Sequence, residues 1–116
     1  MMNTEKANNL IVTLNYCAAQ CSNCVIECLA EQDVKSMAGC IKINLDCAEI
    51  CRTISSFLSR NSIHAQHLMK ECVEICTNCA IQCEQFSHVE HCRKCTEVCR
   101  ICIAECNYFH AEAAQR

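Results

Sequence analysis

A single stretch of this 116-residue chain contains the pattern from which its fold follows: residues 17–28 read CAAQCSNCVIEC. Its cysteines are separated by steps of four, three and four residues, which places them on one face of an α-helix. Residues 72–83 repeat the pattern as CVEICTNCAIQC, at an offset of 55 residues. The same offset relates three more pairs of cysteines: Cys40 to Cys95, Cys47 to Cys102 and Cys51 to Cys106. The chain is therefore a duplicated helical hairpin.

The composition supports long, uninterrupted helices. The chain contains one glycine and no proline, so it lacks the residues that the turns of β-sandwiches and barrels require. The periodicity predicts four helices, at about 4–31, 33–60, 62–86 and 87–111. Connections of a few residues force neighbouring helices to be antiparallel. We therefore predict an all-α fold, an antiparallel up-down-up-down four-helix bundle, in a single domain of residues 1–116.

Capping residues mark the starts of three of these helices. Asp33 is a candidate N-cap for the second helix, and Ser62 in the polar turn Asn61-Ser62 is a candidate for the third. Ser87 and Glu90 have the spacing of a capping box for the fourth helix.

The sixteen cysteines need a chemical explanation. A small cysteine-rich chain is usually a secreted disulfide framework. Residues 1–30, however, contain one basic side chain, Lys6, and their longest early apolar run is residues 10–12, so they predict no export signal. No stretch is long enough to predict a membrane span. We therefore expect a cytoplasmic protein with reduced thiols, for which binding of a soft metal is the leading interpretation.

The cysteine spacing suits metal ions better than disulfides. Side chains at i and i+4 of a helix have Cβ atoms about 5–6 Å apart, whereas a disulfide requires about 3.5–4.5 Å. Two metal–sulfur bonds of about 2.3 Å bridge the wider spacing. Seven Cys-x-x-x-Cys and four Cys-x-x-Cys pairs join into ladders. The candidate ligands are Cys17, Cys21, Cys24, Cys28, Cys40, Cys47, Cys51, Cys72, Cys76, Cys79, Cys83, Cys92, Cys95, Cys99, Cys102 and Cys106.

Charge favours Cu(I) over other metals. Four zinc ions, each held by four thiolates, would place about eight negative charges in a dry core. Cu(I) replaces thiol protons one for one, and thiolate and thioether ligands select it. Iron–sulfur clusters fit less well, because the cysteine motif of bacterial ferredoxins ends in Cys-Pro and this chain contains no proline. The sequence therefore predicts binding of multiple Cu(I) ions per chain. A zinc or general soft-metal thiolate buffer is the alternative, and a purely structural core of protonated cysteines is a further one.

The two ends of the predicted bundle differ. Met37, His88 and His91 gather at one end, and we interpret them as further ligands at a mouth through which copper passes, although both histidines also fit solvated first-turn positions. At the opposite end, apolar side chains continue the cysteine-bearing faces of the helices: Leu10, Leu14, Ile54, Leu58, Ala65, Met69 and Phe109. The remaining histidines, at positions 64, 67 and 110, lie at this second end and are interpreted as surface residues.

Two positions depart from the duplication. Met37 occupies the position equivalent to Cys92, and its thioether keeps a sulfur atom there. Asn44 occupies the position equivalent to Cys99 and has no sulfur atom. Met37 as plain core filler is an equally good interpretation. We interpret Asn44 as a lost ligand, and a buried asparagine would still require a hydrogen-bond partner.

Other function classes are disfavoured. A net charge of −3 without a basic recognition helix argues against a nucleic-acid partner. A redox enzyme or sensor needs one low-pKa thiol set apart from the others, and these cysteines occupy equivalent stripes. We therefore predict that the protein is not an enzyme. Ile26 and Ile81 are equivalent in the repeat and face away from the cysteines, which suggests a homo-oligomer contact.

With these cysteines in four helices, nearly the whole chain resembles the bacterial copper storage proteins, of the cytosolic kind without an export signal. The resemblance implies a four-helix bundle whose core holds many Cu(I) ions and which assembles as a tetramer. It also implies methionine and histidine near one open end, here Met37, His88 and His91. A copper donor or acceptor protein is an expected partner.

Overall fold

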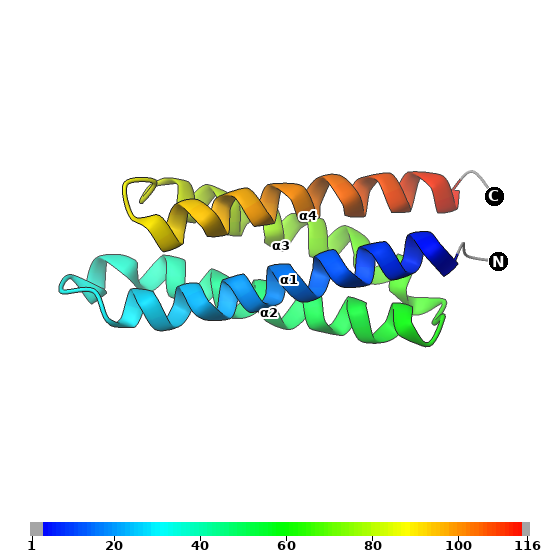
Figure 1. Cartoon of the computed structure of the whole chain (residues 1–116), viewed down its shortest axis with the longest axis horizontal. Coiled ribbons are helices and arrows are strands. Elements are labelled where there is room, and N and C mark those ends of the chain that lie inside the picture. The colour runs from blue at the N-terminus through cyan, green and yellow to red at the C-terminus, as the bar shows by residue number, and fades with distance from the viewer. Residues whose placement is uncertain (1–3, 115–116) are drawn as a thin grey trace.

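The computed structural model describes residues 4–114, which are helical apart from short connections and contain no strand. The four long helices are α1 (Thr4–Leu29), α2 (Ala38–Ser59), α3 (His64–Glu84) and α4 (Glu90–Ala114), and a short 3-10 helix, η1 (Val34–Met37), precedes α2. Successive helices run in opposite directions (Figure 1). The prediction of an all-α, up-down-up-down four-helix bundle is confirmed.

The bundle is a narrow rod of 49 × 20 × 19 Å. In Figure 1, the connections from α1 to α2 and from α3 to α4 lie at the left end, and the connection from α2 to α3 lies at the right end with the start of α1 and the end of α4. The sequence repeat thus becomes two hairpins that point the same way. Equivalent residues of the two hairpins consequently lie at similar depths along the rod.

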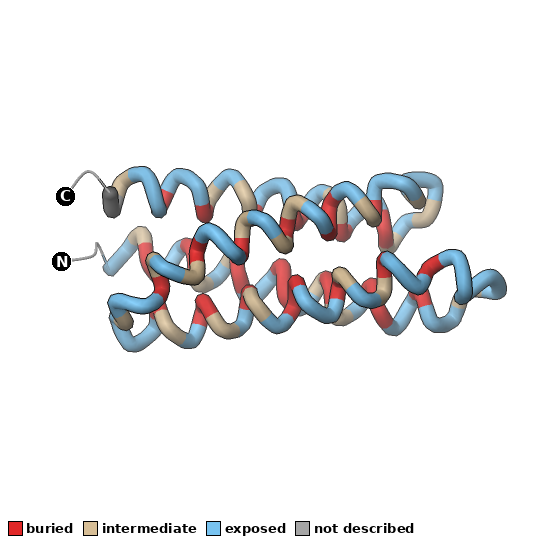
Figure 2. Tube along the Cα trace, turned by 180° about the vertical axis from the view of Figure 1, so that it is seen from behind, coloured by how far each residue is buried: buried red, intermediate tan, exposed pale blue. Residues whose placement is uncertain are grey.

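One buried stripe on each helix forms the core. Buried positions recur every three or four residues and face the interior of the bundle (Figure 2). Aliphatic and aromatic side chains fill the right end of the rod, where Leu14 and Ile54 are fully buried and Phe109 is 6% exposed. Burial of such side chains contributes about 1.5–3 kcal/mol each, so this end stabilises the fold without metal.

Side-chain bonds join the helices outside the core. Thr13 Oγ1 of α1 donates to the Glu105 carboxylate of α4, at 2.9 and 3.0 Å. Arg100 of α4 forms an ion pair with Glu84 of α3. These contacts are partly or fully exposed, and we expect each to contribute less than a buried hydrophobic contact.

The helix boundaries differ from the prediction at the left end. Residues 34–37 form η1 rather than the first turn of α2, and Asp33 makes no side-chain capping bond there. Helix α4 begins at Glu90, because hydrogen bonds of the i to i+3 type wind residues 82–89 into turns first. Ser87 is therefore not the N-cap. At the right end, Asn61 adopts a left-handed φ of 56°, which fits the expected polar turn. Ser62 Oγ accepts from the His64 N–H at 3.2 Å, but the N-cap position of α3 is occupied by Ile63, so Ser62 is not the N-cap.

None of the helices in residues 4–114 is long and apolar enough to cross a membrane.

Candidate metal centre

All sixteen thiols lie inside the bundle and none forms a disulfide. Each cysteine is at most 1% exposed. The Sγ atoms of Cys40 and Cys83 approach to 3.4 Å, well beyond the S–S bond length of about 2.05 Å. The expected inward stripes of unpaired thiols are thus present. Such thiols are free to exchange protons for metal ions.

The sulfur atoms form a connected column along the axis of the bundle. Thirteen of the sixteen cysteines belong to groups whose Sγ atoms all lie within 4.8 Å of one another, and neighbouring groups share members. The five groups are Cys17/Cys21/Cys47/Cys99, Cys17/Cys47/Cys51/Cys76, Cys21/Cys79/Cys95/Cys99, Cys24/Cys28/Cys40/Cys92 and Cys24/Cys83/Cys95. Shared sulfurs are what a bridged cluster of metal ions requires.

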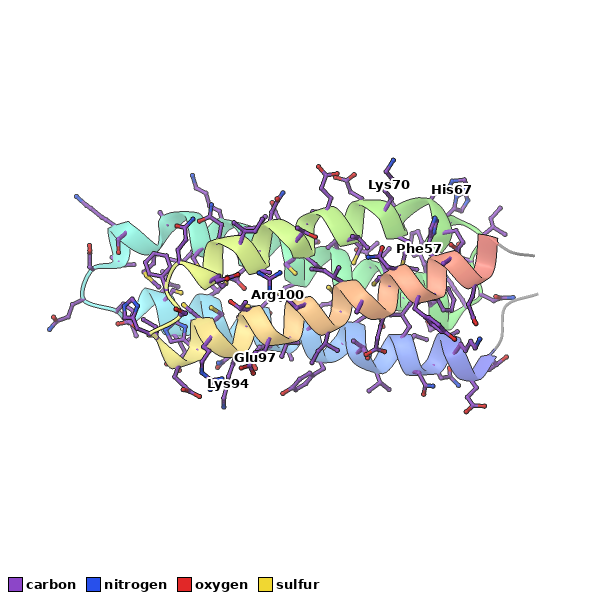
Figure 3. The ribbon with its side chains drawn as sticks, turned by 90° about the horizontal axis from the view of Figure 1, so that it is seen from above. Phe57, His67, Lys70, Lys94, Glu97 and Arg100 are labelled. Carbon is purple, nitrogen blue, oxygen red and sulfur yellow. The ribbon has the colours of Figure 1, made fainter. Side chains whose placement is uncertain are left out.

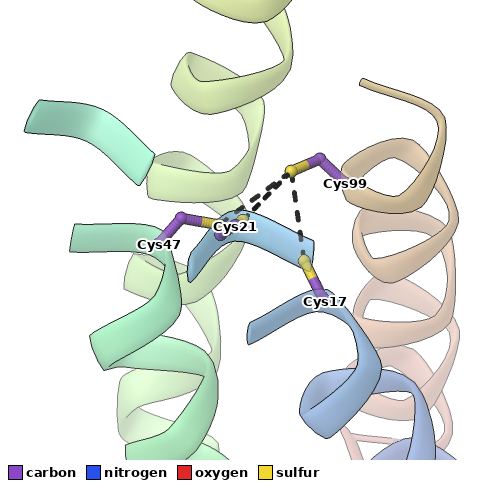
Figure 4. A group of neighbouring side chains, drawn as sticks. All are labelled: Cys17, Cys21, Cys47 and Cys99. Atoms are coloured by element: carbon purple, nitrogen blue, oxygen red, sulfur yellow. Dashed lines mark hydrogen bonds between the residues drawn. The ribbon is translucent and has the colours of Figure 1, made fainter. Parts of the chain in front are cut away.

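One such group joins three helices. Cys99 Sγ of α4 lies 3.9 Å from both Cys17 Sγ and Cys21 Sγ of α1, and 4.0 Å from Cys47 Sγ of α2 (Figure 4). A linear S–M–S unit with bonds of about 2.3 Å spans about 4.6 Å. The sulfur atoms must therefore separate by about 0.6–0.7 Å to hold an ion between them, which rotation of the cysteine side chains can supply.

Asn44 occupies the column in place of a cysteine and is fully buried. Its Nδ2 donates to the Cys40 carbonyl oxygen at 2.8 Å, and to the Sγ atoms of Cys40 and Cys83 at 3.3 Å each. Its Oδ1 accepts from the thiols of Cys95 at 2.9 Å and Cys79 at 3.3 Å. The amide is thus fully bonded. The sequence indicated a need for a partner, and the structure shows that Asn44 links thiols from three helices.

The left end of the column finishes at a group that we call the mouth, defined by Cys28, Met37, His91 and Cys92. His91 Nδ1 lies 3.6 Å from Cys92 Sγ and 3.9 Å from Cys28 Sγ. It also lies 3.5 Å from Cys24 Sγ, one turn deeper. Met37, at the end of η1, is buried. A histidine nitrogen is thereby placed among three thiols.

Glu31 orients this histidine and was not anticipated from the sequence. Its Oε1 lies 3.1 Å from His91 Nε2. A carboxylate on Nε2 favours the tautomer with the proton on that nitrogen, which leaves the Nδ1 lone pair directed at the thiols. The only available signal was that the end of the first helix and the start of the fourth would meet.

His88 lies elsewhere. It is exposed, in the turn before α4, and makes no hydrogen bond or ion pair within residues 4–114. We expected it on the stripe four residues before Cys92, but α4 begins at Glu90, so helical spacing does not extend back to residue 88. Ligation by His88 stays a prediction, and the geometry places it outside the mouth.

The thiols of the left end differ in acidity. Burial raises the pKa of Cys92 to about 12, and burial also raises the pKa of Cys28 above its ordinary value. Hydrogen bonds from Cys24 and then Cys40 lower the pKa of Cys83 to about 4. Without metal, burial therefore keeps the two thiols of the mouth, Cys28 and Cys92, in the neutral form at pH 7.

At the right end, three cysteines lie outside every group: Cys72, Cys102 and Cys106. All three histidines of this end are exposed, as expected. The rings of His64 and His67 have centroids 6.0 Å apart, and His110 Nδ1 lies 2.9 Å from Gln66 Oε1. None of them enters the grouped thiols.

Comparisons with known proteins agree with this geometry. The family model described as copper storage protein matches residues 3–111. The fold is similar to that of a cytosolic copper storage protein from Streptomyces lividans, solved with five coppers, with a TM-score of 0.89, 30% identity, and coverage of 93% of this chain and 94% of that one. A Cu(I)-bound copper storage protein of Bacillus subtilis is similar with a TM-score of 0.85 and 25% identity, over 90% of this chain and 98% of that one.

Among curated proteins, the chain is 29% identical over 77 residues to an uncharacterised cysteine-rich protein, YhjQ, of Bacillus subtilis (strain 168). The match covers 66% of this chain and 70% of that protein.

Proposed function

The chain belongs to the copper storage protein family, and we propose that it stores many Cu(I) ions on the thiolates of its core, in the cytoplasm, and thereby limits copper toxicity. The observation that carries this function is the connected column of buried, unpaired thiols. A site for one metal ion needs at most four sulfur ligands. Sixteen cysteines along one axis therefore suit the storage of many ions. The cytoplasmic location is supported by the Streptomyces lividans protein, which is described as cytosolic.

Charge favours Cu(I) over zinc in this core. A Zn²⁺ ion held by any one group of four thiolates would leave a net charge of −2, and no basic side chain is buried within residues 4–112 to balance it. One Cu(I) replaces one thiol proton, so the filled column remains near neutral. Asn44 and His91 are neutral donors and change nothing in this balance.

The spacing of the sulfur atoms indicates how Cu(I) ions would fill the column of thiols. We expect each Cu(I) to be held mainly by two thiolates, often a Cys-x-x-x-Cys pair such as Cys24 and Cys28, whose Sγ atoms lie 3.9 Å apart. If each sulfur bridges two ions, the capacity approaches about one Cu(I) per cysteine. Each ion releases a proton, so affinity rises with pH and acid weakens binding.

Copper is proposed to pass through the mouth. His91 presents an imidazole nitrogen to Cys24, Cys28 and Cys92, and buried Met37 adds a thioether. These donors bind Cu(I) without losing a proton, so they can receive an ion before a thiol releases its hydrogen. His88, exposed beyond them, is proposed as an outer contact for the arriving ion. A donor or acceptor protein would dock over this end.

We further infer a homotetramer and a non-catalytic role. Ile26 is 65% exposed and Ile81 is 50% exposed, and the repeat places them at equivalent positions of the two hairpins. Apolar side chains in such a symmetric arrangement suit contacts between copies of the chain. No thiol is exposed as a nucleophile or redox centre would require.

Anaerobic titration of the reduced protein with Cu(I) tests the storage function. We expect binding to continue to about one ion per cysteine, with little change in far-UV circular dichroism because the helices are already formed. Replacing Cys17, Cys21, Cys47 and Cys99 with alanine should remove a proportionate share of the capacity. Saturation at a few ions per chain, or displacement of Cu(I) by equimolar Zn²⁺, would refute the proposal.

A further inference from the structure

The thiol groups of the column divide into two sets that meet at one sulfur. The two groups nearest the mouth share Cys24, and their members form what we call the outer set: Cys24, Cys28, Cys40, Cys83 and Cys92. The other three groups overlap with one another and form the inner set: Cys17, Cys21, Cys47, Cys51, Cys76, Cys79 and Cys99. Among the grouped cysteines of residues 4–114, Cys95 alone belongs to groups of both sets. Sulfur-bridged ions of the two sets are therefore joined through Cys95.

The amide of Asn44 contacts this joining sulfur in a fixed orientation. Its Nδ2 donates to the Cys40 carbonyl oxygen at 2.8 Å. A carbonyl oxygen only accepts, so the amide cannot turn over without losing this bond. Oδ1 consequently faces the thiols of Cys95, at 2.9 Å, and Cys79, at 3.3 Å. Because Oδ1 also only accepts, both cysteines carry their hydrogens while these bonds last.

The two ends of the amide act in opposite ways on the sulfurs around it. Nδ2 also donates to the Sγ atoms of Cys40 and Cys83 in the outer set, at 3.3 Å each. An N–H donor stabilises a thiolate more than a neutral thiol, whereas an acceptor stabilises the protonated form. Asn44 thus favours Cu(I) on the outer set and opposes it at Cys95.

Solvent does not reach the joining sulfur from the side of the bundle. Cys95 is fully buried, and its neighbours on α4, Lys94 and Glu97, are exposed and point away from the bundle (Figure 3). The backbone of α4 therefore separates this thiol from solvent. Ions pass between the outer and inner sets along the column, and Asn44 lies beside that route.

We propose that Asn44 is a positioning residue that keeps the outer and inner sets as two separate copper clusters, of which the outer binds Cu(I) more tightly. The inference rests on the proposed storage function. Oδ1 holds Cys95 as a hydrogen-bond donor, so this thiol does not bridge the sets. They join only when Cu(I) replaces that hydrogen: an S–Cu bond forms, the S–H bond breaks and the proton leaves to solvent.

Backbone amide NMR of the reduced wild-type protein tests the separation. Cys28 belongs only to the outer set and Cys47 only to the inner set, so their resonances report on one set each. In an anaerobic titration with chelator-buffered Cu(I), we expect Cys28 to reach half of its shift at about tenfold lower free Cu(I) than Cys47, because buried hydrogen bonds contribute about this factor. Coincident shifts would overturn the proposal.

Asn44→Leu tests whether the amide causes this separation. Leucine is similar in size but neither donates nor accepts hydrogen bonds, so the two midpoints should come within about twofold of each other. Far-UV circular dichroism of the metal-free variant verifies that the helices form, and the wild-type titration decides the question even if the variant does not fold. A separation that stays tenfold in the folded variant would show that Asn44 does not produce it.

A double-mutant cycle tests whether Asn44 acts through Cys95. In a Cys51→Ala background, Asn44→Leu should still narrow the separation by about tenfold, because Cys51 belongs to the inner set without a printed bond to the amide. In a Cys95→Ala background the same substitution should narrow it by less than about threefold, since the hydrogen-bonded thiol is already absent. Equal narrowing in both backgrounds would contradict the mechanism.

Total capacity distinguishes this inference from the storage function. A wild-type protein that saturates at a few ions would contradict storage itself. Full capacity with coincident Cys28 and Cys47 shifts would contradict only the division by Asn44.

Discussion

The two ends of the bundle are built from the same repeat and have opposite properties. At the mouth, His91, Met37 and two cysteines meet beside a carboxylate, Glu31. At the right end, the corresponding layers contain Leu14, Ile54 and Phe109. Hydrocarbon side chains gain free energy from burial without any ligand, whereas thiols gain most when they bind metal. The comparison indicates that one end maintains the fold, and we propose that the other end exchanges the copper ions.

The largest expected effect concerns the stability of the right end. Leu14→Ala should lower the free energy of unfolding of the metal-free protein by about 3 kcal/mol, because a fully buried side chain is replaced by a cavity. Urea denaturation monitored by circular dichroism measures this. Val12→Ala, at an exposed position of the same helix and away from the proposed contact between copies, should change stability by less than about 0.5 kcal/mol. If the two variants were equally stable, the right end would not be what maintains the fold.

A smaller loss is expected within the column itself. Asn44→Ala should destabilise the metal-free protein by about 2 kcal/mol, since it removes the hydrogen bonds to Cys40, Cys83 and Cys95 and leaves a cavity. The exposed Asn23, changed to alanine, provides the control. An unchanged denaturation midpoint for Asn44→Ala would show that thiols pack as well without the amide.

Alkaline pH should weaken the mouth but not the hydrocarbon layers. The pKa of Cys92 is about 12 in the folded protein and about 9 when unfolded, so the unfolded chain loses this proton first as pH rises. Stability is fully present below pH 9 and falls between about pH 9 and 12, by about 1.4 kcal/mol at pH 10 from this thiol alone. Denaturation of the metal-free, reduced protein measures the loss. Cys92→Ala should reduce the slope, and an equal slope in that variant would contradict the assignment.

The smallest expected effect sharpens the distinction between the two histidines of the left end. His91→Gln should slow Cu(I) uptake by about tenfold while the final capacity changes little, because the imidazole faces three thiols. Glu31→Gln should slow it to a lesser degree, since it only orients the ring. His88→Gln should have the weakest effect, because His88 is exposed in the turn. Stopped-flow measurement with a Cu(I) chelator as donor compares the three, and a larger effect for His88 would contradict the definition of the mouth.

Much of the fold and of the candidate site was predictable from the spacing of one residue type. Steps of three and four between cysteines specify a helix and one buried face, and the 55-residue offset specifies two equivalent hairpins. Short connections then leave only an antiparallel arrangement, which decides that Met37 and Cys92 share an end with Cys28. These inferences needed only local periodicity and chain connectivity, so they held for the helices, the inward thiols and the hydrocarbon layers.

Tertiary structure decided the features that depend on how separate helices rotate and slide against one another. Periodicity could not show that α4 begins at Glu90, and so could not separate His91, among the thiols, from His88, in solvent. Nor could it show that Asn44 bonds thiols of three helices, or that Cys72, Cys102 and Cys106 lie apart from the grouped sulfurs. Each of these depends on how closely residues that are far apart in the chain approach one another in the bundle. Helical spacing determines which face a side chain occupies, but only packing of the four helices determines which atoms meet across the axis.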